Sequence, residues 1–147
     1  MHVNRFDDKA CLRGALYSII KDCTGEEQTK KEIKKEIENK TQGAVTSIFP
    51  GDVEGVVKKL FNTVRIINVN NRDDLNKISP VDNNSSFGLI FFKGDGNINR
   101  HAVRLIDNSN DSIYIMDATK QLDEQIEFDK IFEFSPQGFD LVILEQL

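Results

Sequence analysis

The sequence predicts an α+β domain in which N-terminal helices pack against an antiparallel β-sheet. Helical periodicity marks the first part of the chain, and β-type alternation follows it up to the C-terminus. The alternating segments are short and are separated by polar, turn-rich stretches, which favours antiparallel pairing. A chain of 147 residues can bury a core without a metal or a disulfide. We therefore expect one domain spanning residues 1–147.

Three helices are predicted. The first follows Asp8, a suitable N-cap, and this start places Cys11 in the first helical turn. The second follows the capping-box sequence Thr24–Glu27 and runs to about Lys40 as a charged surface helix. The third covers residues 53–61, where five apolar side chains recur at helical spacing, so this helix should pack on the core.

Six strands are predicted after these helices, because β-branched and aromatic residues alternate or cluster between turn signals. Two polar loops separate them, one at residues 83–86 and one at 93–97, and the second contains Gly94 and Gly96 and is interpreted as a hairpin turn. The expected strands are Thr63–Val69, Phe87–Phe92, His101–Ile106, Ser112–Asp117, Ile126–Phe134 and Phe139–Leu144.

The hairpin that joins His101–Ile106 to Ser112–Asp117 carries a possible catalytic pair. If Ile106 faces Ser112, partner numbers add up to 218, and His101 then lies directly opposite Asp117. Directly opposed residues have Cβ atoms about 4.5–5.5 Å apart on one face of the sheet. A carboxylate at that distance fixes the tautomer of an imidazole and stabilises its protonated form. The plainer alternative is a cross-strand ion pair on the surface.

Cys11 is the candidate nucleophile for this histidine. Unpaired backbone N–H groups and the helix dipole favour the reactive thiolate in a first helical turn. Gly14, Ala15 and Ser18 share a helix face with Cys11, and their small side chains permit close packing of the helix on the sheet. Cys23 is instead interpreted as a small buried hydrophobic residue.

The order Cys11 on a helix, His101 opening a strand and Asp117 closing the next strand resembles the papain-like cysteine peptidases. The resemblance is greatest to short bacterial members, namely bacteriocin-processing peptidases and the papain-like toxin domains of secreted effectors. The chain departs from the family at Arg5 and Phe6, where a glutamine usually helps to bind the oxyanion, and at Ala118, where many relatives have proline. The remaining oxyanion candidates are the Cys11 backbone N–H and the side chain of Asn4.

The resemblance implies a cysteine protease that acts as an antibacterial effector toxin. It would cleave a protein substrate in the cytoplasm of a target cell, and a cognate immunity protein would block its site. A larger secreted precursor, of which this chain is the toxic C-terminal part, is compatible with the sequence. Three alternatives stay open: a glutamine deamidase toxin, a cell-wall amidase with the same apparatus, and a catalytically silent binding or immunity domain.

Composition and charge exclude several other classes. The net charge of −5, from 24 acidic and 19 basic residues, gives no reason to expect nucleic-acid binding. No apolar stretch approaches the roughly 20 residues of a membrane span, and the N-terminus lacks a signal-peptide core. Cys11 and Cys23 are too far apart on one helix to form a disulfide. One histidine, one cysteine and one aspartate make a poor metal site, so we expect neither a metal nor another cofactor.

Overall fold

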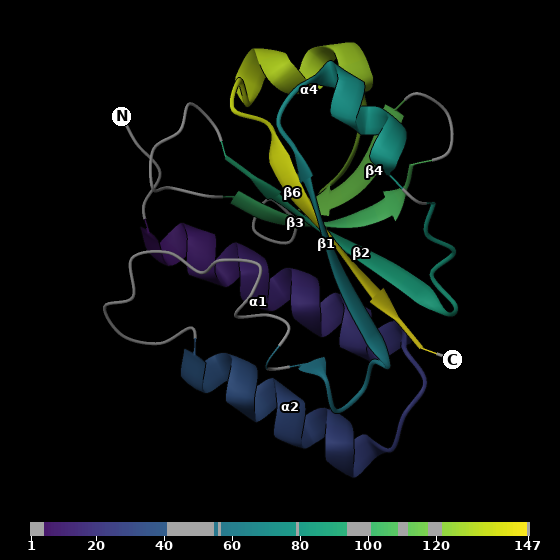
Figure 1. The fold of residues 1–147 in the computed structure, drawn as a ribbon. Helices are drawn as coiled ribbons and strands as arrows, with labels where there is room; N and C mark the ends of the chain where they lie inside the picture. The colour runs from purple at the N-terminus through teal and green to yellow at the C-terminus, as the bar shows by residue number, and fades with distance from the viewer. Residues whose placement is uncertain are drawn as a thin grey trace.

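The computed structural model has the predicted α+β architecture, with helices on both sides of a six-stranded sheet (Figure 1). It describes residues 5–40, 55, 57–78, 80–93, 101–108, 112–117 and 122–146, and for some of these, Cys11, His101 and Asp117 among them, it describes the backbone alone. The elements in chain order are α1 (Arg5–Asp22), α2 (Glu27–Lys40), β1 (Thr63–Val69), the 3₁₀ helix η1 (Arg72–Lys77), β2 (Ser86–Phe92), β3 (His101–Asp107), β4 (Ser112–Asp117), β5 (Leu122–Glu127), α4 (Phe128–Phe134) and β6 (Phe139–Glu145).

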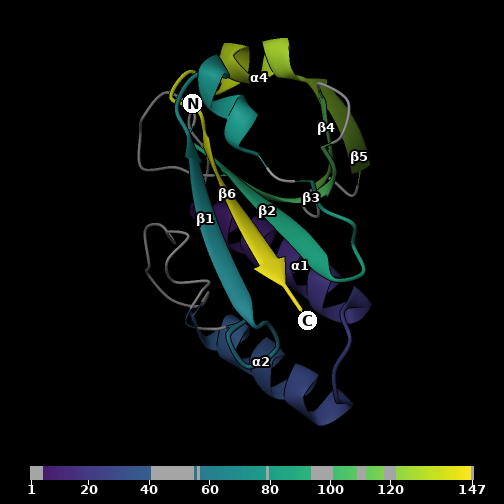
Figure 2. The same cartoon turned by 45° about the vertical axis from the view of Figure 1, so that its right-hand side comes forward.

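The strands lie in the order β1-β6-β2-β3-β4-β5, and every neighbouring pair is antiparallel. The last strand of the chain is therefore inserted between the first two, as Figure 2 shows. In β2 and β6 almost every residue is buried, because both faces of the central sheet are covered. Their sequences are accordingly runs of apolar residues rather than a strict apolar-polar alternation.

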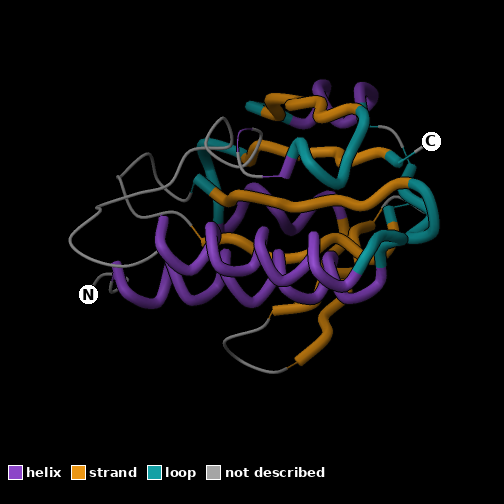
Figure 3. Tube along the Cα trace, turned by 90° about the horizontal axis from the view of Figure 1, so that it is seen from below, coloured by secondary structure: helices purple, strands orange, loops and turns teal. Residues whose placement is uncertain are grey.

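Two apolar clusters fill the two faces of the sheet. On one face α1 packs across the strands, and α2 lies against α1 through Ile33 and Ile37 (Figures 1 and 3). On the other face Leu75 of η1 and Ile131 of α4 cover the strands. The strand residues under α1 are Phe87, Leu89, Phe91, Ala102, Val142 and Leu144, and those under η1 and α4 are Val69, Ile90, Phe92, Val103, Leu105, Ile113, Ile115, Ile126, Phe139, Leu141 and Ile143.

Three predicted elements differ from the structure. The first helix begins at Arg5, three residues before the predicted N-cap Asp8. The predicted strand Ile126–Phe134 is wrong at both ends, because β5 begins four residues earlier, at Leu122, and the chain turns into α4 after Glu127. Apolar residues at positions 128, 131 and 132 also satisfy helical spacing, and short segments of this kind are ambiguous. Of the predicted helix 53–61, Gly55 and Val57 are helical, whereas residues 53, 54 and 56 lie outside the described residues. The prediction is wrong beyond Val57, because residues 58–60 form a turn.

The turn before β6 requires its glycine. Gly138 has φ +88°, and a Cβ built there would lie 1.9 Å from the carbonyl oxygen of Val69. The Gly138 N–H donates to the Ser135 carbonyl at 2.8 Å, and the Gly138 carbonyl accepts from the Lys93 N–H at 3.0 Å. This glycine therefore joins the end of α4 to the ends of β1 and β2.

The loop before β2 is organised by Asp82. Its carboxylate accepts hydrogen bonds from the backbone N–H groups of Asn84, Ser85 and Ser86, at 2.8, 2.8 and 2.9 Å. These donors, with the Ser85 hydroxyl, hold the pKa of Asp82 far below its usual range. Asn83, in the left-handed region with φ 59°, completes the predicted turn. Within the described residues, no helix is long and apolar enough to cross a bilayer.

Candidate active site

The backbone brings the three predicted catalytic positions to one end of the sheet. His101 is the first residue of β3, and Asp117 is the last residue of the antiparallel strand β4. Figure 1 shows the N-terminal end of α1 at the end of the sheet where β3 begins, and Cys11 is in the N-terminal half of that helix. The three elements that carry the predicted residues therefore start or end toward the same end of the sheet.

The register between β3 and β4 differs from the prediction. Arg104 pairs with Met116 and Leu105 with Ile115, so partner numbers add up to 220 rather than 218. A bulge between Leu105 and Asp107 adds a residue on the β3 side, which the simple turn count did not include. The prediction that His101 lies directly opposite Asp117 is therefore wrong.

The corrected register still keeps the two positions close. If the pairing of Arg104 with Met116 is extended, position 117 lies across from Val103, two residues from His101. Positions 101 and 117 then share one face as diagonal neighbours, about 7–8 Å apart, which long side chains can span. On its other side His101 pairs with Phe92, whose ring packs edge-on against Phe139 at 6.1 Å.

The early start of α1 changes the environment of Cys11. In a helix that begins at Arg5, Cys11 is the seventh residue and lies in the second turn. The prediction of a first-turn position is therefore wrong. Its backbone N–H is no longer one of the unpaired donors of the helix start, and the dipole effect fades beyond the first turn. The Cys11 N–H is thus a weaker oxyanion candidate than expected, and Asn4, the other one, lies outside the described residues.

The faces of the sheet place a further condition on the site. Ala102 belongs to the cluster under α1, whereas Val103 and Leu105 belong to the cluster under α4. By strand alternation, position 101 shares the face of Val103. A helix residue and a β3 residue on opposite faces can meet only around the open end of the sheet. The start of β3 and the N-terminal half of α1 both lie toward that end (Figure 1).

Arg104 links the two elements that carry Cys11 and His101. Although only 3% exposed, its guanidinium donates through Nη1 to the Ser18 carbonyl at 3.1 Å, the Ser18 hydroxyl at 2.7 Å and Asp22 Oδ2 at 2.6 Å. Nη2 lies 3.4 Å from Asn83 Oδ1, and the group packs over the Phe87 ring at 5.7 Å. A buried charge with several acceptors on one helix joins that helix to the sheet.

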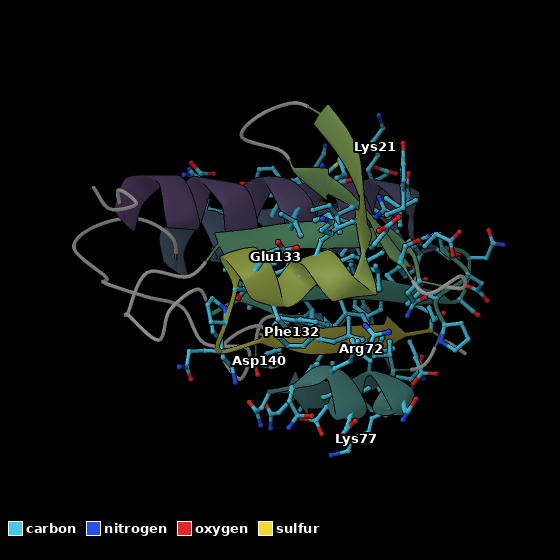
Figure 4. The ribbon with its side chains drawn as sticks, turned by 90° about the horizontal axis from the view of Figure 1, so that it is seen from above. Lys21, Arg72, Lys77, Phe132, Glu133 and Asp140 are labelled. Carbon is cyan, nitrogen blue, oxygen red and sulfur yellow. The ribbon has the colours of Figure 1, made fainter. Side chains whose placement is uncertain are left out.

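Asp140 is a second buried charge, and it lies near the end of the sheet where β3 begins. Lys93, which follows β2, places its ammonium 3.3 Å from Asp140 of β6 and 3.1 Å from Asn70 Oδ1. The Asp140 side chain is 6% exposed and that of Lys93 is 22% exposed. Figure 4 shows Asp140 toward the end of the sheet at which α1 begins. In the register of the sheet Asp140 pairs with Phe91 of β2, which in turn pairs with Ala102, the residue after His101.

Cys23 has the structural role that the sequence predicts. The thiol is buried and donates to the Ile20 carbonyl at 3.2 Å. Burial, as the largest cause, raises the pKa of Cys23, so it stays protonated and unreactive at neutral pH. Among the described residues, no group of three His, Cys, Asp or Glu side chains is arranged to hold a metal ion.

The sequence interpretation assigned no role to Arg104, Lys93 or Asp140. Each of them adjoins or interrupts an apolar strand segment, where burial of an unpaired charge would destabilise the fold. That signal was available in the segments Val103–Leu105, Phe87–Lys93 and Phe139–Leu144. No family model and no curated protein matches the chain.

Proposed function

We propose that this chain is a papain-like cysteine hydrolase. Cys11 attacks the carbonyl carbon of an amide, and His101 accepts the thiol proton and passes it to the leaving amine. Water then hydrolyses the thioester, with His101 as the base, and restores the thiol. Asp117 orients the imidazole. The observation that carries the proposal is the convergence of α1, the start of β3 and the end of β4 at one end of the sheet.

Activation of the thiol depends on His101 in this proposal. Because α1 starts at Arg5, the helix terminus contributes little to the acidity of Cys11. In the proposed site an imidazolium beside the sulfur stabilises the thiolate. Diagonal placement of positions 101 and 117 lets a carboxylate orient that imidazole across the two strands.

The substrate and setting follow from the resemblance to short bacterial effector domains. The chain acts as an antibacterial toxin that cleaves a protein in the target cytoplasm, and a cognate immunity protein covers its site. It reaches the target as part of a larger effector. The same chemistry at a glutamine side chain makes a deamidase, and at a cell-wall peptide it makes an amidase.

A second candidate is a catalytically silent binding domain with this fold. Two observations favour it: Cys11 lies beyond the first turn of α1, and α1 covers the face of the sheet opposite to that of Val103 and Leu105. An enzyme and a binder differ in stoichiometry, because an enzyme acts on many targets and a binder on one each.

The test combines reactivity and turnover. Iodoacetamide should label Cys11 faster than Cys23 at pH 6–7, and His101→Ala should remove this preference. Expression in a bacterial cytoplasm should arrest growth, and Cys11→Ala should relieve the arrest. If Cys11→Ala is as toxic as the wild type, the enzyme hypothesis is wrong and the binding-domain hypothesis takes its place.

Mass spectrometry of the target lysate separates the enzymatic alternatives. New protein fragments indicate a protease, whereas a gain of about one mass unit at glutamine indicates a deamidase. Harmless expression in the cytoplasm combined with lysis after export to the periplasm indicates a cell-wall amidase. The control is Cys23→Ala, which should retain the toxicity of the wild type because Cys23 is a buried core thiol.

A further inference from the structure

We infer that Arg104 is a positioning residue, which fixes where α1 lies along β3 and thereby sets the spacing between Cys11 and His101. This inference rests on the proposed function. It assigns Arg104 no contact with substrate and lets it act through the two elements that carry the reacting groups.

The contacts of Arg104 concentrate on one turn of α1. Nη1 binds both the carbonyl and the hydroxyl of Ser18, at 3.1 and 2.7 Å, and Asp22 Oδ2 at 2.6 Å. Ser18 and Asp22 are four residues apart and share a helix face. The Ser18 hydroxyl also lies 3.7 Å from the sulfur of Met116 on β4. This turn of the helix is thus anchored to two strands.

The guanidinium is also held from the side of the sheet. Asn83 Oδ1 lies 3.4 Å from Nη2, and the Asn83 amide donates to the Ile106 carbonyl at 2.7 Å. The Phe87 ring lies under the charge at 5.7 Å. A planar guanidinium held from both sides restricts axial movement of the helix more than an apolar side chain would, because its donors have a fixed geometry.

The distances along the two elements match. Cys11 precedes Ser18 by seven residues, which is about 10.5 Å along a helix. His101 precedes Arg104 by three residues, which is about 10 Å along a strand. α1 and β3 start at the same end of the sheet. Arg104 therefore holds positions 11 and 101 at nearly the same level along the sheet, although position 101 belongs to the face opposite α1, so that Cys11 and His101 can meet only around the end of the sheet.

The accuracy with which reacting groups must be placed gives the buried charge of Arg104 a role in this interface. A misplacement of about 1 Å can reduce a reaction about 100-fold. Ala102, on the same face of β3, shows that an apolar contact with α1 is compatible with this surface. Hydrogen bonds from a rigid group define the helix position more narrowly than apolar contacts do.

The experiment measures the rate of Cys11 alkylation by iodoacetamide between pH 5 and 9, with each cysteine peptide quantified by mass spectrometry. The variants are Arg104→Met, Arg104→Lys, Asp22→Ala and His101→Ala. Arg65→Met is the matched control, because Arg65 is an exposed arginine on β1 that pairs with Glu145. Thermal melts monitored by circular dichroism report whether each variant is folded at the assay temperature.

Arg104→Met should label Cys11 about tenfold more slowly than the wild type at pH 6, since the thiolate loses its imidazolium. Arg104→Lys should recover part of the rate, and Arg65→Met should match the wild type. If Arg104→Met does not fold, Asp22→Ala replaces it, because the Asp22 side chain is half exposed and its removal is tolerated more easily.

The outcomes separate the two claims. If His101→Ala leaves the profile unchanged, the proposed cysteine hydrolase is wrong. If His101→Ala changes the profile while folded Arg104→Met and Asp22→Ala do not, the positioning role of Arg104 is wrong and the hydrolase stands. An equal change in Arg65→Met would also overturn that role, because it would trace the effect to a general loss of stability.

Discussion

Replacing Gly138 with alanine should destabilise the fold by about 3–4 kcal/mol. The left-handed backbone at φ +88° costs an alanine about 1–2 kcal/mol. The new Cβ would also lie 1.9 Å from the Val69 carbonyl oxygen, so the backbone must move. That movement weakens the hydrogen bonds to the Ser135 carbonyl and from the Lys93 N–H, each of which contributes about 1 kcal/mol.

Thermal unfolding monitored by circular dichroism measures this effect. For a chain of this size the loss corresponds to a fall in melting temperature of about 10 °C. The matched control is Gly55→Ala, because nothing lies within 4 Å of a Cβ built at this exposed, helical glycine. The control should be neutral or stabilising by about 0.5–1 kcal/mol. A Gly138→Ala protein within about 0.5 kcal/mol of the wild type would refute the reasoning.

Three further predictions concern side chains with defined partners. Because its hydrogen bonds lower the pKa of Asp82 in the folded state, the ionised carboxylate stabilises the fold fully above the ordinary aspartate pKa of about 3.9. This contribution declines as pH falls from there toward the much lower folded-state pKa, because the unfolded chain binds a proton first, so the stability gap between wild type and Asp82→Asn should narrow in urea melts between pH 5 and 2. Cys23 should be alkylated only after unfolding, and labelling of the native thiol within minutes at pH 8 would contradict its burial. A double-mutant cycle of Lys93→Met and Asp140→Asn should give a coupling of about 1 kcal/mol or more, whereas additive effects would show that the contact contributes nothing.

Most of the fold could be predicted because the periodicities are strong and local. The strands β1, β2, β3, β4 and β6 agree with the predicted ranges to within one residue at each end. The sequence could not decide whether the segment after Ile126 is a helix or a strand, since its apolar residues satisfy both the helical and the strand period. Only packing against the covered face of the sheet selects the helix. The position of β6 between β1 and β2 is a long-range pairing that no local pattern encodes.

The candidate site was predictable in its elements but not in its register. The residues around His101 and Asp117 identify two adjacent strands, while the bulge near Ile106 depends on how the hairpin twists. The start of α1 at Arg5 is likewise invisible to a search for N-caps, because Asp7 and Asp8 suit a helix start but occur inside the helix. The errors in the β3–β4 register and in the start of α1 change the expected distances between the candidate residues, but not which residues are the candidates.

The strand order has a consequence for how the chain folds. β6 pairs with β1 and β2, so residues 63–69 must wait for residues 139–145 before the sheet can close. Closing so long a loop is entropically costly and slows folding relative to chains with local pairings. During synthesis β1 therefore lacks its strand partner until β6 has left the ribosome. A ribosome stalled before β6 would carry a nascent chain with β1 separated from the rest of the sheet, and that chain would be the form most open to proteolysis and chaperone binding.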